Sequence, residues 1–545
     1  MATSNSNPLD LESADNRSRG HSATKAMLVT AGATLVVLFF GLPTLVFPLA
    51  TDQVLYVLGA RTILDGGVLY SDLWEIKAPM VFLFYAVPVA AFGEHAVAIR
   101  LLDLANTLVG VLAVYLLGRR FFGQLAAMLG AGLFGVTYLT WGNVGALAEA
   151  EAFMAVPLAL AFYVYLPRDD ARSTNVRAVA AGLLLGLAFT FKGTALLFVL
   201  GLPAAELLFR QEGRWGPAGA ARRMVLAAAG FVAVQSVVIV YLSTAGGLSD
   251  FVDIQRNYTQ PYNQFLFPEG MEYPRFLVDE TSKWMKDTPH LIVPAAVGLL
   301  FALFRPRYQR GAYFLALLAT IGVAGIWWQG KMFNYHWLVI LPLLAPLGGF
   351  GLEQLWRLFA NLPERGRRLG LALLGALVLL LFLQPMLHTY DGYRVLARRV
   401  SGSMSQAEVD VHYMGLLEQN HQLVSYIREN GSSEDQLFVW GLWPVLHFWL
   451  DDRPLVSRFA SNHGLRATWA PESWRNELMA DLEAAQPTFF AIGQGDVQPW
   501  LVGTTETSQE HFQNNFPALR SFVESGYELV LDNGLFHLYQ RRDSS

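Results

Sequence analysis

Long runs of apolar residues dominate the first 386 positions, and short polar or charged stretches separate them. A helix needs about 20 predominantly apolar residues to cross a bilayer. The pattern predicts about eleven membrane-spanning helices, of which the pair around 178–209 is the least cleanly divided. The runs lie near residues 27–49, 101–118, 124–141, 152–167, 178–197, 195–209, 224–244, 290–304, 311–328, 335–352 and 369–386.

The two ends of the chain have a different pattern. Residues 1–26 are polar, rich in Ser and Asn, and no small-residue cleavage site follows the first apolar run. A signal peptide would carry such a site. We therefore expect residues 1–26 to be a disordered cytoplasmic tail, residues 27–386 to be the polytopic transmembrane domain, and residues 387–545 to be a separate extracytoplasmic domain.

Residues 387–545 predict a small α/β fold. Ser405–Asn430 has helical spacing and precedes Gly431, a favourable helix-ending residue. Alternating apolar runs at Gln436–Trp440 and Thr488–Ile492 predict strands. Tyr527–Tyr539 predicts a hairpin with a type I′ turn, because its centre contains Asn-Gly. The whole chain is therefore expected to be a membrane α-helical bundle with a C-terminal extracytoplasmic α/β domain.

Composition supports the membrane assignment and excludes several classes of site. The 545 residues are 53% hydrophobic and only 15% charged, whereas soluble domains carry about 25% charged residues. The net charge is −5, and no basic block is interleaved with aromatic residues, so no nucleic-acid partner is predicted. The chain has no Cys, which excludes disulfides, thiolate metal sites and cysteine nucleophiles.

The distribution of Lys and Arg predicts the orientation. With the N-terminus inside, the inner segments hold 19 Lys and Arg residues and the outer segments before residue 387 hold 9. Positive charge collects in cytoplasmic loops. Because the number of spans is odd, residues after 387 are expected outside. We therefore expect a multi-pass protein of the inner (plasma) membrane.

Ionisable residues gather in the expected outer loops, whereas the span centres are nearly empty of charge. Glu206 is the main exception and lies toward the inner end of its run. Proton and ion pathways normally need ionisable groups near mid-membrane. Five outer loops instead carry charge, at Asp52, Glu75 and Lys77, at Glu149 and Glu151, at Lys192, at Arg256, Arg275, Lys283 and Lys286, and at Lys331 with His336.

This set suits a substrate with a lipid tail and a phosphorylated sugar head. Acid–base chemistry on a hydroxyl needs a carboxylate, and a departing phosphate needs cations. The candidate catalytic residues are Asp52, Glu151 and Glu149, and the candidate phosphate-binding residues are Lys77, Lys192, Lys331 and His336. Each has a structural alternative: a Lys at a span end often snorkels to the interface, and His336 can belong to an aromatic belt. The convergence of five loops favours the site.

At these positions the sequence resembles the C-type glycosyltransferases (GT-C), in particular the protein O-mannosyltransferases, the lipid A aminoarabinose transferases and the Rgt-type lipopolysaccharide-core transferases. The similar segments are Thr51-Asp52-Gln53, Leu64-Asp65-Gly66-Gly67-Val68-Leu69-Tyr70-Ser71-Asp72, Glu75-Ile76-Lys77-Ala78-Pro79, Gly118-Arg119-Arg120-Phe121-Phe122-Gly123, Glu149-Ala150-Glu151-Ala152-Phe153, Phe191-Lys192, Tyr335-His336-Trp337-Leu338-Val339-Ile340-Leu341-Pro342, Asp452-Arg453-Pro454 and Ser457-Arg458. Two departures stand out: Ile76 occupies a position where these families often have His, and Ala152 replaces a common Pro.

The resemblance implies transfer of a sugar from a polyprenyl-phosphate donor to a lipid, glycan or protein acceptor on the outer face, with inversion. Asp52 is implied as base or orienting carboxylate, Glu151 as support for the acceptor or anomeric centre, and Lys77, Lys192 and Lys331 as ligands of the donor phosphate. No nucleotide-sugar site and no cofactor are expected. No metal is required, although two outer carboxylates could hold a divalent ion, and that alternative stays open.

Three other functions are weighed. A transporter or lipid flippase predicts inverted repeats and mid-membrane polar groups, which the sequence does not display. A non-catalytic scaffold or receptor gives no reason for charge to gather from five loops. A polymerase or ligase of polyprenyl-linked glycans is close in chemistry and remains the main alternative.

Overall fold

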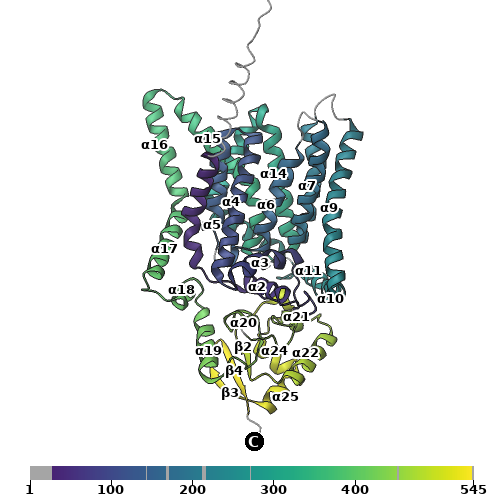
Figure 1. Ribbon diagram of the computed structural model, residues 1–545. Helices are drawn as coiled ribbons and strands as arrows, with labels where there is room; N and C mark the ends of the chain where they lie inside the picture. The colour runs from purple at the N-terminus through teal and green to yellow at the C-terminus, as the bar shows by residue number, and fades with distance from the viewer. Residues whose placement is uncertain are drawn as a thin grey trace, which may run out of the picture.

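The computed structural model describes residues 28–142, 144–166, 171–210, 216–270, 272–450 and 453–542. Figure 1 shows an upright bundle of long helices with a mixed α/β domain attached at one end of it. The fold class expected from the sequence is therefore confirmed. The predicted tail over residues 1–26 and Asp452 of the family-like motif lie outside the described residues.

Every apolar run expected to span the membrane corresponds to a helix or a helix pair. Within the described residues, six helices are long and apolar enough to cross a membrane, or seven if one bent pair counts as a single span. These are Leu28–Val46, α4 (Ala96–Phe121), α7 (Ala171–Phe191), α9 (Pro217–Ala245), α14 (Pro306–Gln329), η5 with α15 (Asn334–Ile340 and Leu341–Ala360), and the pair α16 and α17 (Glu364–Leu381 and Leu383–Val400).

The other expected spans are shorter apolar helices of 10–17 residues. They are α5 (Gln124–Thr140), α6 (Ala150–Tyr165), η3 with α8 (Gly193–Leu200 and Gly201–Phe209) and α13 (Pro289–Leu303). Backbones approach closely where two of them pack on α15: a Cβ on Gly298 of α13 would lie 2.0 Å from the Leu347 carbonyl oxygen, and one on Gly130 of α5 would lie 2.7 Å from that of Ala345. Small residues of this kind let helices in membranes approach closely.

Short helices occupy the end of the bundle that faces the α/β domain. They are α2 (Thr51–Leu64), α3 (Pro79–Phe92), α10 (Leu248–Ile254), the π-helical turn η4 (Gln255–Thr259), α11 (Gln260–Gln264) and α12 (Glu272–Asp287). In Figure 1, α2 and α3 lie across the lower rim of the bundle, next to the α/β domain. Pro79 begins α3 at its first position, where its missing N–H leaves no hydrogen bond unmade.

The boundary expected at residue 387 falls inside a helix. α17 continues to Val400, at an angle of 51° to α16. It packs on the start of the chain, where the Tyr393 hydroxyl donates to the Phe39 carbonyl at 2.9 Å and Gly392 lies against Pro43. The α/β domain therefore begins after α17, with α18 (Gln406–Tyr413).

The α/β domain is built on a four-stranded sheet of order β1-β2-β4-β3. β1 (Leu437–Trp440) pairs in parallel with β2 (Phe489–Gly493), and β4 (Phe536–Arg541) is antiparallel to both β2 and β3 (Tyr527–Asp532). All residues of β1 and β2 are buried, although β1 lies at the edge of the sheet, so both faces of these strands are covered. The surrounding helices are α19 (Leu417–Asn430), α20 (Val445–Trp449), α21 (His463–Arg466), α22 (Glu472–Ala485), α23 (Pro499–Val502), α24 (Ser508–Asn514) and α25 (Pro517–Gly526).

Two local expectations in this domain are corrected. The helix expected over Ser405–Asn430 is two helices, α18 and α19, since α18 ends at Tyr413 and α19 starts at Leu417. The hairpin is present, but its loop has three residues and only Gly534 has a positive φ, of 79°. A type I′ turn needs positive φ at both central residues, so Asn533 does not form one.

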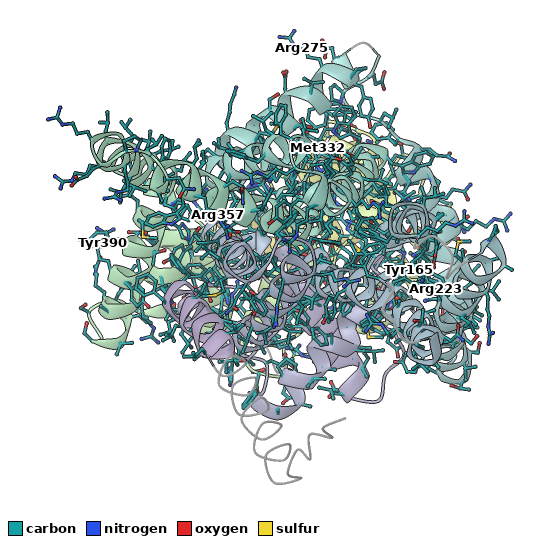
Figure 2. The ribbon with its side chains drawn as sticks, turned by 90° about the horizontal axis from the view of Figure 1, so that it is seen from above. Tyr165, Arg223, Arg275, Met332, Arg357 and Tyr390 are labelled. Atoms are coloured by element: carbon teal, nitrogen blue, oxygen red, sulfur yellow. The ribbon has the colours of Figure 1, made fainter. Side chains whose placement is uncertain are left out.

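A buried ionic cluster lies toward the far end of the bundle, away from the α/β domain. Glu206 accepts from the Tyr165 hydroxyl at 2.8 Å and lies 3.3 Å from Arg223 Nε. Figure 2 looks onto the bundle from above and labels Tyr165 and Arg223 side by side at one edge of it. Glu206, the exceptional carboxylate of the sequence pattern, is thus paired within the bundle and is remote from the outer-loop cluster.

Candidate active site at the domain interface

A cavity of about 430 Å³ lies between the bundle and the α/β domain. The bundle contributes residues from the start of α2, the loop before α3, the loop before α6, α11 and the start of η5. The α/β domain contributes Leu442, Ser461, His463, Gln498 and Leu501. Four of the five expected outer loops therefore reach one cavity, and the α/β domain closes it from the other side.

Asp52 and Lys77 form an ion pair on the cavity wall. The Lys77 Nζ to Asp52 Oδ2 distance is 2.7 Å, and the two side chains are 22% and 26% exposed. Burial alone would raise the pKa of Asp52, but the Lys77 ammonium outweighs it and holds that pKa below its ordinary value. Burial would likewise lower the pKa of Lys77, but Asp52 and the neighbouring carboxylates raise it. Both groups therefore stay charged at neutral pH.

Glu149 lines the same cavity just before α6. Its Oε2 accepts from the Tyr56 hydroxyl of α2 at 2.9 Å, and its buried Oε1 has no partner among the described residues. Burial raises the pKa of Glu149 well above its ordinary value. A carboxyl that is neutral near pH 7 can donate a hydrogen bond, which an ionised one cannot.

Glu151 lies beside this cavity rather than on its wall. It forms a short ion pair with Lys192, and its Oε1 lies 3.5 Å from His336 Nε2. Burial lowers the pKa of Lys192 despite the Glu151 carboxylate. Glu151 and His336 line a small space with residues of η3 and α14, whereas Glu151, Lys192 and His336 are not part of the larger cavity's lining.

Tyr335 stands between the two ion pairs. The centre of its ring is 5.6 Å from Lys77 Nζ and 5.8 Å from Lys192 Nζ, and its hydroxyl adds to the stabilisation of ionised Asp52. A cation within about 6 Å of an aromatic ring is attracted to its face. Tyr335 therefore joins the two cations across the cavity wall. The sequence singled out the adjacent His336 and not this residue.

Lys331 does not line the cavity. Its Nζ donates to the Phe265 carbonyl at 2.7 Å and the Trp500 carbonyl at 3.3 Å, and it lies 4.3 Å from the centre of the Tyr262 ring. These contacts tie α11 to the α/β domain. The phosphate-binding role expected for Lys331 stays a prediction, and its geometry points to domain docking.

A buried network fixes the positions of Asp52 and Glu149. Gln53 Nε2 donates to the Val144 and Leu147 carbonyls at 3.0 and 2.7 Å, and its Oε1 accepts from Arg100 at 3.0 Å. Gln53 is fully buried, so each lost bond would leave a polar group unpaired. The network holds the first turn of α2 against the loop that leads to Glu149.

The Glu151–Lys192 pair gives a prediction on stability. We expect Lys192→Met to destabilise the fold by about 3–5 kcal/mol, because it leaves the buried Glu151 carboxylate without its ammonium partner. Glu151→Gln should cost less, because the Lys192 side chain is 23% exposed. The double variant should lose less than the sum of the two single variants. Thermal unfolding of the detergent-solubilised protein measures this, and strict additivity would contradict the coupling.

The comparisons with known proteins agree with this arrangement. The family model described as dolichyl-phosphate-mannose-protein mannosyltransferase matches residues 76–241. ArnT from Cupriavidus metallidurans bound to undecaprenyl phosphate is a similar solved structure, with a TM-score of 0.60, 15% identity and coverage of 96% of this chain and 99% of ArnT. No curated protein sequence matches this chain.

A second similar structure is the archaeal oligosaccharyltransferase AglB from Archaeoglobus fulgidus, in complex with an inhibitory peptide and a dolichol-phosphate. Its TM-score is 0.50 at 11% identity, with 95% of this chain and 74% of AglB covered. The chain has the GT-C fold. It is a polytopic membrane protein of that fold, with α2, α3 and the loop carrying Lys77 at the domain-facing end. The resemblance stated from the sequence is confirmed at this level.

Within the GT-C fold, the sequence identified the charged residues but missed several uncharged ones. Asp52, Lys77 and Glu149 were expected and lie together on the cavity wall. Tyr335 and Tyr262 were missed, as were Ser461, His463 and Gln498 of the α/β domain. Tyr335 had one sequence signal, its position beside His336, whereas none of the other four lies near a candidate site residue in the sequence.

Proposed function

We propose that this protein is a glycosyltransferase that moves a sugar from a polyprenyl-phosphate donor to a hydroxyl of an envelope lipid, glycan or protein. The observation that carries the proposal is the Asp52–Lys77 ion pair on the wall of a cavity between the membrane bundle and the α/β domain. A carboxylate and a cation in contact supply the two requirements of this transfer, a proton acceptor and a phosphate ligand.

Donor binding would activate the base. A phosphate at the cavity competes with Asp52 for the Lys77 ammonium. Lys192 lies on the other side of the Tyr335 ring and helps to neutralise the negative charge of the phosphate. Lys77 holds the pKa of Asp52 below its ordinary value. Once the phosphate pairs with the Lys77 ammonium, Lys77 lowers the pKa of Asp52 less, and Asp52 becomes a stronger base. The chemistry then starts only after the donor is bound.

The transfer step is a single displacement. Asp52 accepts the proton of the acceptor hydroxyl as that oxygen bonds to the anomeric carbon. The bond from the anomeric carbon to the phosphate oxygen breaks on the opposite face, with inversion. The electron pair leaves with polyprenyl phosphate, whose charge Lys77 and Lys192 stabilise. Glu149, which lines the cavity beside Asp52, orients the acceptor, and Glu151 holds Lys192 in place.

The similar proteins support the class of donor. ArnT is described with undecaprenyl phosphate and AglB with a dolichol-phosphate, and the matching family model is of dolichyl-phosphate-mannose-protein mannosyltransferases. All three names contain a polyprenyl phosphate. A lipid-linked donor brings its sugar already attached, so we propose no nucleotide-sugar site. No metal is required by the proposal, because lysines can neutralise a single phosphate.

The proposed orientation puts the site on the outer face of the inner membrane. The Lys and Arg bias toward one set of loops supports it. We expect reporter fusions after Arg120 and after Ser401 to give opposite signals, cytoplasmic for the first and extracytoplasmic for the second. Equal signals from the two fusions would rule out this orientation.

Incubation of the purified protein with labelled polyprenyl-phosphate sugars and extracted envelope glycolipids and glycans tests the function. We expect label to move from at least one lipid donor to the acceptor fraction, and no label to move from nucleotide sugars. A glycan polymerase or ligase would instead need a polyprenyl diphosphate donor. A flippase would move the donor across a vesicle membrane and leave the sugar on its lipid.

A further inference from the structure

Glu75 is a buried carboxyl that the proposed transfer does not use. It is 1% exposed and lines the cavity. Its Oε1 accepts from the amides of Ile76 and Lys77 at 2.8 and 3.3 Å, while its Oε2 is buried with no partner among the described residues. An unpaired buried oxygen costs free energy unless something binds it. Glu75 therefore has one carboxyl oxygen without a hydrogen bond among the described residues, in a side chain that lines the cavity.

Three uncharged polar side chains of the α/β domain line the same cavity: Ser461, His463 and Gln498. His463 is 6% exposed, and its Nδ1 lies 3.0 Å from Ser461 Oγ. Burial lowers the pKa of His463 to about 3, so the ring is neutral near pH 7. Burial also raises the pKa of Glu75 to about 7, which populates its neutral form. The three side chains of the α/β domain therefore offer hydrogen bonds without charge, and Glu75 adds a carboxyl whose neutral form is populated near pH 7.

The α/β domain is held firmly enough to place these side chains. The Trp74 ring packs on His463 at 5.1 Å between centroids, and a Cβ on Gly464 would lie 2.3 Å from that ring. The Trp74 amide donates to the Arg458 carbonyl at 2.8 Å, and the Tyr258 hydroxyl donates to the Leu501 carbonyl at 2.8 Å. The domain and the loop that carries Glu75 thus pack as one unit beside the cavity.

We propose that Glu75, Ser461, His463 and Gln498 form the subsite for the acceptor, and that it recognises a polyhydroxylated, uncharged sugar group. The cavity then has two kinds of wall. Asp52 and Lys77 form the charged one, which suits the donor phosphate, and these four side chains form the neutral one. The inference rests on the proposed function, because it assigns the second substrate of the same transfer.

The chemistry of the two substrates supports this division. A phosphate is best bound by cations, and none of these four side chains is a cation near pH 7. Sugar hydroxyls are both donors and acceptors, so neutral carboxyl, hydroxyl, imidazole and amide groups can bind them without placing an unpaired charge in a buried site. Because three of the four residues belong to the α/β domain, that domain selects the acceptor.

The test compares variants that keep shape but change hydrogen bonding. Glu75→Gln keeps a polar group of the same size, whereas Glu75→Met removes it. His463→Phe keeps a ring against Trp74 and Tyr258 but removes both nitrogens. The control is Ser457→Ala, since Ser457 donates to Asp481 at 2.6 Å and does not line the cavity. The probes are polyprenyl-phosphate mannose as donor and a neutral glycolipid fraction extracted from bacterial envelopes as acceptor.

We expect Glu75→Met and His463→Phe each to raise the half-saturating concentration of the acceptor fraction about 3- to 10-fold, as loss of one hydrogen bond implies. The half-saturating donor concentration should change less than about 2-fold on the same basis. Glu75→Gln, which keeps a hydrogen-bonding group, should raise the half-saturating acceptor concentration less than Glu75→Met does, and Ser457→Ala should resemble the parent. Unchanged acceptor dependence in folded Glu75→Met and His463→Phe would overturn the subsite, as would an equal rise for donor and acceptor.

A binding measurement separates this inference from the proposed function. The immobilised parent protein, without donor, should retain glycolipids of the fraction, and Glu75→Met and His463→Phe should retain less. If the parent transfers no sugar but this difference in retention is found, the proposed function fails and the subsite stands as a glycan-binding site. Equal retention by all the proteins would overturn the subsite whether or not transfer occurs.

Discussion

Asp52→Asn is expected to lower turnover by about 10²-fold or more with the fold intact, in line with the contribution of general-base catalysis. The substitution keeps the size of the side chain and removes the charge that accepts the proton. The carboxylate lies 2.7 Å from Lys77 on the cavity wall. Its side chain is 26% exposed, so its loss should cost little stability. Initial rates at saturating donor and acceptor measure the effect.

The turnover of two further carboxyl variants is compared with that of Asp52→Asn. Glu149→Gln should lower turnover less, because its carboxyl is largely neutral and the amide can still donate. Glu151→Gln should lower turnover severely, through the loss of the partner that holds Lys192. Near-normal transfer by a folded Asp52→Asn protein would remove Asp52 from the mechanism.

Lys77→Met is expected to weaken binding of the lipid donor by about 10- to 100-fold, which corresponds to the roughly 1.5–3 kcal/mol of a hydrogen bond to a charged group. Methionine keeps the apolar stem, so packing contacts survive and mainly the charge is lost. Binding of the neutral acceptor fraction should change little. Equilibrium binding of a radiolabelled polyprenyl-phosphate sugar in detergent measures the loss.

Other lysines provide the controls for Lys77→Met. Lys283 on α12 is 64% exposed and distant from the cavity lining, so Lys283→Met should bind donor as the parent does. Lys331→Met should mainly lower the unfolding temperature, because Lys331 holds the Phe265 and Trp500 carbonyls. Parent-like donor binding by Lys77→Met would make the assigned phosphate site wrong, even though the fold assignment stands.

The membrane architecture was largely predictable because each span leaves an apolar run in the sequence. The expected runs each coincide with a helix or a helix pair, even where the helix has only 10–17 residues. The end of the last span was not predictable, since α17 continues to Val400 through a polar sequence that packs on the first span. Gly415 lies in the break between Tyr413 and Leu417, but a single Gly is tolerated within a helical pattern and does not by itself predict an end.

The candidate site was predictable only where charge marked it. A Lys or a carboxylate in an otherwise apolar chain is conspicuous, which is why Asp52, Lys77 and Glu149 were found. Tyrosines are common at membrane interfaces, so nothing in the sequence distinguished Tyr335 from an aromatic-belt residue. The contribution of His463 depends on how the α/β domain docks on Trp74, some 390 residues away in the chain. Such long-range packing leaves no local pattern.

The most direct test of the central claim follows both parts of the donor through one reaction. A polyprenyl-phosphate sugar carrying ³²P in the phosphate and ¹⁴C in the sugar is incubated with the purified protein and the acceptor fraction. We expect one polyprenyl monophosphate to appear for each sugar transferred, with the anomeric configuration inverted. Sugar transfer only from a polyprenyl diphosphate or a nucleotide sugar, or release of the lipid phosphate without any transfer, would contradict the account.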